Sequence, residues 1–590
     1  MPWKMEIDPL GSLALSALIA AVPILYLFWA LAYKRMKGHW AAISAVVIAT
    51  LIAIVAYGMP INLSVLSIFN GFIFGLWPVC WIVVTAVYIY NLSVETKQFE
   101  IIKNSLAAIS DDRRVQAVII AFSFGAFLEG AAGFGTPVAI SAAMLAGLGF
   151  NPIYAAGICL IANTAPVAFG AIGIPIVVAA GVSGVDMMAI SKMVGRQLPF
   201  FSIIVPFYMA VVMAGWKKAI EIWPILLVSG GSFALTQFFV SNYIGPYLPD
   251  ILSAIISIIA TVIFAKIWHP KESWTFEHEG AALGRAKLQF SAGQVFRAWA
   301  PFILLSIFVA AWGIKPVKAA LDQLATFKFP IVGLDKEVID HLGKPKGAVY
   351  AFNLLSAAGT AILFAGILSI PVMGASLSTA LKVAGRTLNQ LKWPIVTIGT
   401  IIGFAYLYNF SGMAITLGYA FASTGVIFPF FAAFLGWLGV FMTGSDTSSN
   451  ALFGKLQEVT ARQIGVDPVL TVATNSSGGV FGKMISPQSI AVATAATGYV
   501  GHEGDIFRFT LKHSIILTIM MGIIAMLQAY VFTWMIPQWE QVVVQAAQQA
   551  AKAATPSGIP SEGIYYLIAT FVISFMIVIL SRVMGRGVSR

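Results

Sequence analysis

The sequence predicts an all-helical, polytopic membrane protein built from two related halves. Of its 590 residues, 59% are hydrophobic and only 10% are charged, whereas a soluble protein usually carries about 25% charged residues. Two distant apolar segments, each interrupted by glycine and proline, also resemble each other. Apolar runs of about 20 residues, long enough to cross the hydrocarbon core, recur throughout and indicate roughly thirteen spans. Clear examples are 12–33, 40–58, 248–267, 347–370, 514–535 and 563–581.

The basic residues predict how the spans are oriented. Lys and Arg gather in the cytoplasmic loops of membrane proteins, so the net charge of +11 fits a membrane protein and gives no reason to expect a nucleic-acid partner. Basic clusters occur at 34–37, 97–114, 217–218 and 266–297, and again in the C-terminal tail. A single path through the membrane, with the N-terminus outside and the C-terminus inside, can place all of them on the cytoplasmic side.

An internal repeat predicts the unusual part of the architecture. The segment "ANTAPVAFGAIGIP" (162–175) matches "TNSSGGVFGKMISP" (474–487) without gaps, and "FLEGAAGFGTP" (127–137) matches "FMTGSDTSSNA" (441–451) in the same order. Each repeat is predicted to contain a re-entrant hairpin followed by a discontinuous transmembrane helix. Paired interruptions of this kind point to the substrate site of a transporter, because irregular backbone at membrane depth must be buried or line a cavity. The charge pattern puts the two hairpin openings on opposite sides, so the repeats are predicted to be inverted.

The repeat divides the chain into six parts, with the hairpins and broken helices predicted to form a moving domain. The parts are N-terminal scaffold helices (1–92), an amphipathic cytoplasmic connector (93–114), the first half of the transport domain (115–182), scaffold helices and connectors (183–424), the second half of the transport domain (425–499) and C-terminal helices (500–590).

The interruptions predict a binding site for a small carboxylate. Helix N-termini carry partial positive charge, and Lys483 adds a full charge where the first repeat has Ala171. Alternatively, the Lys483 ammonium extends to the membrane surface, and the polar residues satisfy only backbone groups. The predicted substrate-binding residues are Gly133, Gly135, Thr136, Asn163, Thr164, Gly170, Ser448, Ser449, Asn475, Ser476, Ser477 and Lys483.

Two acids at the predicted hairpin tips, Glu129 and Asp446, are candidates for proton coupling. Acidic residues at membrane depth are costly, so they tend to face cavities and to serve as proton relays. The same carboxylates could instead coordinate sodium. A purely structural role is the alternative for both acids, since Glu129 could cap a helix or pair with Lys483, and Asp446 could be an N-terminal cap.

No pattern of catalysis or of cofactor binding occurs in the sequence. The six histidines lie in or beside polar connections and form no H-E-x-x-H motif, and there is no G-x-S-x-G or G-x-x-x-x-G-K-[ST] motif. Cys80 and Cys159 lie in apolar runs and predict neither a disulfide framework nor a metal site. The residues therefore predict a small carboxylate and the membrane lipid as partners, with a proton or sodium as the coupling ion and without nucleic acid, a metal site or another cofactor.

The sequence resembles the lactate permease family over nearly its whole length. The motifs that carry this resemblance are "FLEGAAGFGTPVAI", "LIANTAPVAFGAIGIPI", "GSDTSSNALFG" and "ATNSSGGVFGKMISPQSIA". The resemblance implies proton-coupled uptake of L-lactate, and of D-lactate and glycolate, across a bacterial inner membrane. It also implies an elevator-type transporter, an architecture in which scaffold domains often form homodimers. A sodium-coupled carboxylate transporter or ion exchanger of the same superfamily is the nearest alternative, and a membrane-embedded enzyme and a channel are more distant ones.

Overall fold

Helices that are long and apolar enough to cross a membrane make up most of the structure. The computed structural model describes residues 2–34, 36–107, 109–131, 133, 136–270, 272–276, 290–499, 502–539 and 561–585. Within this part of the chain there are 12 such helices, or up to 13 if one bent pair is counted as a span. The prediction of a helical, polytopic membrane protein is thereby confirmed.

The first part of the chain runs from the N-terminus through the first repeat. Before the repeat the elements are β1 (Trp3–Lys4), α1 (Leu13–Phe28), η1 (Trp29–Tyr33), α2 (Gly38–Val55), α3 (Ile61–Phe74), η2 (Gly75–Cys80), α4 (Trp81–Glu95) and α5 (Gln98–Ala107). The first repeat contains α6 (Arg113–Ala117), η3 (Val118–Phe124), α7 (Gly125–Ala131), α8 (Thr136–Gly147), α9 (Pro152–Ala162), η4 (Val167–Phe169) and α10 (Gly170–Ser183).

The second part of the chain joins the repeats and continues to the C-terminal helices. The joining elements are α11 (Met187–Val194), α12 (Leu198–Glu221), α13 (Trp223–Phe239), η5 (Val240–Ile244), α14 (Pro249–Ile267), α15 (Ala292–Gly313), α16 (Lys315–Ala325), β2 (Thr326–Pro330), β3 (Val338–Ile339), β4 (Val349–Asn353), α17 (Ala358–Met373), α18 (Leu377–Ser411) and α19 (Met413–Ala422). The second repeat and the C-terminal part contain η6 (Gly425–Ile427), α20 (Phe428–Thr443), α21 (Asp446–Gln463), α22 (Pro468–Lys483), α23 (Pro487–Thr497), α24 (Glu503–Tyr530), η7 (Thr533–Met535) and α26 (Ser561–Gly585).

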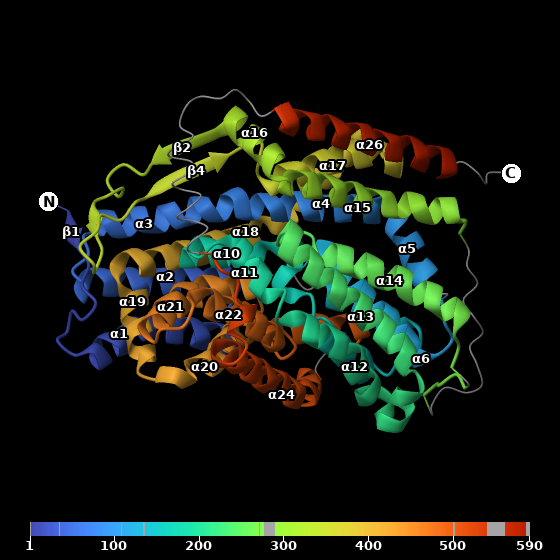
Figure 1. Ribbon diagram of the computed structural model, residues 1–590, viewed down its shortest axis with the longest axis horizontal. Coiled ribbons are helices and arrows are strands. Elements are labelled where there is room, and N and C mark those ends of the chain that lie inside the picture. Colours follow the sequence, from blue (N-terminus) through green and yellow to red (C-terminus); the bar gives the residue numbers. More distant parts are fainter. Residues whose placement is uncertain are drawn as a thin grey trace.

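Packing contacts define two groups of helices, and α15, α17 and α26 of the first group lie along one edge of the molecule (Figure 1). In one group α18 packs on α2 and α3, α17 packs on α4, and α15 packs on α17 and α26. In the other group α20 packs on α22 and α24, and α13 packs on α12 and α14. Helices α12 and α14 also contact α9 and α7 of the first repeat, although the sequence assigned residues 183–424 to the scaffold. Which helices move and which stay fixed remains a prediction.

Glycines let the second repeat pack tightly. A methyl group added at Gly436 of α20 would lie 1.8 Å from the carbonyl oxygen of Asn475, and one at Gly478 of α22 would lie 2.4 Å from the carbonyl oxygen of Ala433. Small residues at these positions allow α20 and α22 to approach more closely than larger side chains would, as is common between membrane helices.

Two short strand pairs were not predicted from the sequence. Strands β2 and β4 pair antiparallel, and β1 pairs in parallel with β3. Both pairs lie at one end of the molecule, opposite the end at which α26 finishes (Figure 1). The apolar run 347–370, predicted as one span, is divided between β4 and α17. That prediction was wrong because an apolar run shows hydrophobicity but does not by itself distinguish a strand from a helix.

Candidate functional site

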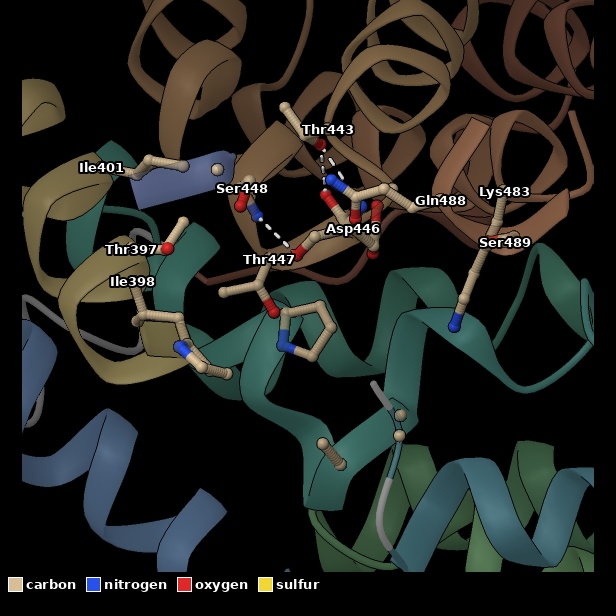
Figure 2. Close-up of a pocket in the computed structure, with 18 of the residues that line it drawn as sticks. Thr397, Ile398, Ile401, Thr443, Asp446, Thr447, Ser448, Lys483, Gln488 and Ser489 are labelled. Carbon is tan, nitrogen blue, oxygen red and sulfur yellow. Dashed lines mark hydrogen bonds between the residues drawn. The ribbon is translucent and has the colours of Figure 1, made fainter. Parts of the chain in front are cut away.

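A cavity of about 370 Å³ lies where the two repeats meet the helix α18. Figure 2 shows Asp446, Thr447 and Ser448 of the second repeat facing Thr397 and Ile398 of α18. The first repeat contributes Glu129, Gly133, Val167, Gly170, Ala171 and Pro175 to the lining, and the second contributes Thr443, Gly444, Ser445, Asp446, Thr447, Ser448, Lys483, Gln488, Ser489 and Val492.

A buried ion pair joins the two repeats at this cavity. The ammonium nitrogen Nζ of Lys483 lies 2.7 Å from Oε1 of Glu129, and the two side chains are only 8% and 5% exposed. The side-chain amide of Asn163 donates to the other oxygen, Oε2, at 2.9 Å. Glu129 therefore pairs with Lys483, as the structural alternative anticipated, and it also faces the cavity. Because both residues line the cavity, the pairing does not exclude a role in coupling.

The backbone of the first repeat makes room for the Glu129 carboxylate. A methyl group added at Gly170 would lie 2.6 Å from Oε1 of Glu129, so only glycine permits this approach. The three following residues, Ala171, Ile172 and Gly173, have φ angles of 45°, 59° and 72°. Alanine and isoleucine rarely adopt this left-handed conformation, which costs about 1–3 kcal/mol per residue and tends to occur at functional sites. The interruption of the first discontinuous helix is therefore strained and lies directly on the cavity.

The first interrupted helix follows the prediction. Helix α9 ends at Ala162, and the apolar helix pair of the first repeat is bent by 63° before α10 continues. Pro166 explains the break, because a proline inside a helix removes a hydrogen bond and clashes with the preceding turn. Asn163 and Thr164 lie in the interruption, and the hydroxyl of Thr164 donates to the carbonyl of Ile161.

The second interrupted helix differs from the prediction. Asn475, Ser476 and Ser477 were expected in unwound backbone, but α22 continues through all three to Lys483. The interruption comes later, before α23 begins at Pro487. This prediction was wrong because the second repeat has Gly478 where the first has Pro166, and glycine weakens a helix without breaking it.

Two helix N-termini open onto the cavity. The hydroxyl of Ser445 accepts a hydrogen bond from the backbone N–H of Ser448 and caps α21. The hydroxyl of Ser486 accepts from the N–H of Ser489 and caps α23 in the same way. Residues from the first turn of each helix line the cavity. Both helices therefore direct partial positive charge toward its interior, which favours a bound anion.

Asp446 is buried beside the cavity. Its oxygen Oδ2 accepts from the hydroxyl of Ser476, and the Asn450 amide lies 3.4 Å from the same oxygen. Oxygen Oδ1 has no hydrogen-bond partner within the described part of the chain. The capping group of α21 is Ser445 rather than Asp446, so the N-cap alternative for Asp446 was wrong.

The structure brings together some of the predicted site residues and separates others. Glu129, Gly133, Gly170, Ser448, Lys483 and Asp446 line the cavity, whereas Thr164, Ser449, Asn475, Ser476 and Ser477 lie outside its lining. Asn475 bonds instead to Asn450 and Gln457, and Ser449 to the carbonyl of Gly436. Gly135 and the side chain of Thr136 lie outside the described residues. The assignment of Asn163 as a direct substrate ligand stays a prediction.

Several cavity residues were not identified from the sequence. Gln488 and Ser489 follow Pro487 in the first turn of α23, and that motif gave a signal that could have found them. His39, Trp393 and Thr397 come from α2 and α18, outside the repeat, and nothing in the sequence connects them with the site. The rings of His39 and Trp393 stack with their centroids 4.2 Å apart.

A second cavity, of about 900 Å³, lies further along the same helices. The first cavity contacts α18 near Thr397 and α10 near Gly170, whereas the second contacts them near Asn409 and Gly181. Its lining includes the basic residues Lys318, Lys328, Lys346 and Lys455. Burial, with a smaller contribution from the charge of Lys455, lowers the pKa of Lys346 to about 7.

Comparisons with known proteins identify the family. The family model of L-lactate permease matches residues 16–532. The chain belongs to this family. It is 52% identical over 555 residues to the glycolate permease GlcA of Escherichia coli (strain K12), covering 90% of this chain and 99% of the relative. It is also 52% identical over 563 residues to the L-lactate permease of Bacillus subtilis (strain 168), covering 91% of this chain and all of the relative.

Among solved structures, the YdaH transporter of Alcanivorax borkumensis is similar at a TM-score of 0.42 and 14% identity, over 80% of this chain and 89% of that chain. Membership of the L-lactate permease family makes the chain a membrane permease rather than an enzyme.

Proposed function

We propose that this permease imports L-lactate and related 2-hydroxymonocarboxylates, such as D-lactate and glycolate, by proton symport across the cytoplasmic membrane. The names of its relatives supply the substrate class, since they include an L-lactate permease and a glycolate permease at 52% identity. The observation that carries the mechanism is the Glu129–Lys483 ion pair at a cavity onto which two helix N-termini open.

The ion pair offers a direct way to couple a proton to a carboxylate. While Glu129 is ionised it holds the Lys483 ammonium, and a substrate anion must compete for that cation. When Glu129 accepts a proton, Lys483 is free to bind the substrate carboxylate, with the N-termini of α21 and α23 adding favourable dipoles. The occupied site then has the same net charge as the empty one. One proton and one monocarboxylate therefore enter together.

The other residues that line the cavity are also suited to binding a small hydroxy acid. Hydroxyl groups of Thr397, Ser448 and Ser489 and the amide of Gln488 belong to lining residues and can bond a substrate hydroxyl. Ile398 and Ile401 form an apolar wall for a methyl group. An apolar pocket with a few polar groups is the usual composition of a site for a small ligand.

We further propose that the repeats are inverted and that they carry the substrate in an elevator-type movement, with the N-terminus outside and the C-terminus cytoplasmic. Two cavities follow one another along α10 and α18. This arrangement supports a movement that exposes the substrate site to one side of the membrane at a time. The orientation is supported by contacts between basic loops at one end. Arg114 bonds to the carbonyl of Lys218 and to Glu221, and Asp112 accepts from the N–H of Trp274. A homodimer formed by the fixed helices stays a prediction.

The test is uptake of labelled L-lactate into proteoliposomes under an imposed pH gradient. The wild type is expected to accumulate lactate, and Glu129→Gln, which cannot ionise, is expected to exchange lactate without accumulating it. Glu95→Gln is the control, because Glu95 is also an ion-paired glutamate, with Arg386 as its partner, but lies outside both cavities. That control should accumulate lactate.

The other outcomes identify what is wrong with the proposal. Accumulation by Glu129→Gln would mean that Glu129 does not carry the proton. A wild type that ignores the pH gradient and responds to a sodium gradient would show a sodium-coupled transporter instead. Lactate consumed without net accumulation would indicate an enzyme.

A further inference from the structure

A third acid, Asp250, lies fully inside the protein. It occupies the first turn of α14 and is 1% exposed. Neither of its carboxylate oxygens has a hydrogen-bond partner among the described residues. The N-cap of α14 is Leu248, and its N-terminus has no side-chain cap, so Asp250 does not serve the helix as a cap. An ionised carboxylate buried without donors is very costly, and a neutral acid fits these surroundings better.

Asp250 touches the hairpin tip that carries Glu129. A methyl group added at Gly130, the residue after Glu129, would lie 2.7 Å from Cβ of Asp250. The chain just before Asp250 also packs against the strained interruption, because a methyl group at Gly173 would lie 2.2 Å from the carbonyl oxygen of Pro246. The start of α14 is therefore held between the two elements of the first repeat that form the cavity.

The charged groups near Asp250 are few. Glu129 and Lys483 are close enough to interact with it electrostatically. Among the described residues of the elements packed on α14, which are α7, η3, α10, α13 and η5, the ionisable side chains are Glu129 and Tyr243. Tyr243 is 69% exposed, and nearby Tyr247 directs its hydroxyl to the sulfur of Met187. Lys483 thus lies near both acids, and Glu129 is the one that holds it in an ion pair.

We propose that Asp250 is a proton-binding site that works together with Glu129 and Lys483 in coupling. This inference rests on the proposed proton symport. In the empty state of this scheme Glu129 is ionised and holds Lys483, while Asp250 carries a proton. When a substrate carboxylate takes Lys483, Asp250 passes its proton to Glu129 and is protonated again from the external solution. After inward movement the substrate leaves, Glu129 releases one proton to the cytoplasm and pairs with Lys483 again.

This scheme keeps the charge balanced in the empty state and in the fully loaded state, the two states that move across the membrane. The empty site contains one ionised acid, one ammonium and one neutral acid. The loaded site contains the substrate anion, the ammonium and two neutral acids. Both have zero net charge, so neither places an unpaired ion in the membrane interior. One proton crosses with each substrate molecule.

The experiment compares Asp250→Asn with the wild type in proteoliposomes, measuring both lactate exchange and accumulation driven by a pH gradient. Asparagine has the shape of the neutral acid but cannot pass on a proton. We expect the variant to retain exchange and to lose accumulation. Asp186→Asn is the matched control, since Asp186 caps α11 by accepting from the N–H of Ala189 and asparagine caps equally well. That control should retain both activities.

A second variant covers the case in which Asp250→Asn does not fold. Asp250→Glu keeps an ionisable acid at a changed position, and we expect it to accumulate lactate with a shifted pH profile. Asp250→Asn that accumulates lactate like the wild type, or Asp250→Glu with an unchanged pH profile, would overturn the inference while leaving lactate symport intact. A wild type that does not respond to the pH gradient would overturn the proposed symport itself, and this inference with it.

Discussion

The two interrupted segments start from matching sequences and end in different structures. In the first repeat the chain leaves the helix after Ala162, passes through left-handed backbone at 171–173 and places Gly170 against Glu129. In the second repeat α22 continues to Lys483 and breaks only just before Pro487. One segment supplies the space for an acid and the other supplies the cation that pairs with it. Matching positions in a repeat can therefore have similar residues without having the same role in the site.

Lys483 is where the two segments differ most in charge, and its replacement is expected to have the largest effect. Lys483→Ala introduces the residue that the first repeat has at Ala171 and leaves the Glu129 carboxylate buried without its cation. Removing one partner of a buried pair costs about 3–5 kcal/mol. We expect lower thermal stability and no net lactate accumulation, measured by thermal unfolding and uptake. Lys483→Ala combined with Glu129→Gln should recover stability but not transport. A single variant that accumulates lactate normally would contradict the pairing.

The aligned glycines Gly170 and Gly482 are expected to respond differently to replacement by alanine. A methyl group at Gly482 would lie 2.2 Å from the backbone oxygen of Trp437, whereas one at Gly170 would meet the side-chain carboxylate of Glu129. Gly482→Ala should destabilise the protein by about 1–3 kcal/mol, because backbone cannot give way as a side chain can. Gly170→Ala should lose less stability but should change the pH profile of lactate uptake. If both variants change only stability and leave the pH profile of uptake unaltered, this difference between the two glycines is contradicted.

Replacing the two aligned asparagines, Asn163 and Asn475, is expected to have an effect similar to that of the glycine replacements or smaller. Asn163→Ala removes a hydrogen bond to the ionised Glu129, which is worth about 1.5–3 kcal/mol, and should change the pH dependence of uptake. Asn475→Ala removes the buried hydrogen bonds that join the Asn475 amide to Oδ1 of Asn450 and to the side-chain amide of Gln457, and it should cost about 1–3 kcal/mol of stability. Transport per folded molecule should then be unchanged. Uptake normalised to folded protein distinguishes the two roles, and equal pH profiles in both variants would contradict this assignment.

The smallest effect on stability is expected from a change at Pro166, the position at which the two interrupted helices begin to differ. Pro166→Gly gives the first repeat the residue found at Gly478. Loss of the proline constraint in the unfolded chain should cost about 1 kcal/mol of stability, as measured by thermal unfolding. Lactate affinity should also fall, because the interruption is then less firmly held. Unchanged affinity would mean that the left-handed residues 171–173 alone maintain the interruption.

The sequence by itself determined the membrane class and the repeat, and it singled out the acids Glu129 and Asp446. Long apolar runs and glycine–proline interruptions are local properties, so they can be identified without a structure. Glu129, Asp446 and Lys483 stood out for the same reason, since a charge within an apolar segment is visible in the sequence. The difference between Pro166 and Gly478 was visible too, and weighing it would have predicted the longer helix in the second repeat.

Only the tertiary structure decided which of these residues meet. Lys483 contacts Glu129 from 354 positions away, and α18 supplies one wall of the cavity from outside the repeat. Asp250 had no distinguishing feature in the sequence, because an acid at the start of a helix is ordinary. Its isolation follows from the packing of α14 against Gly130. Contacts between distant segments depend on how helices pack together, and hydrophobic periodicity does not specify which faces will adjoin.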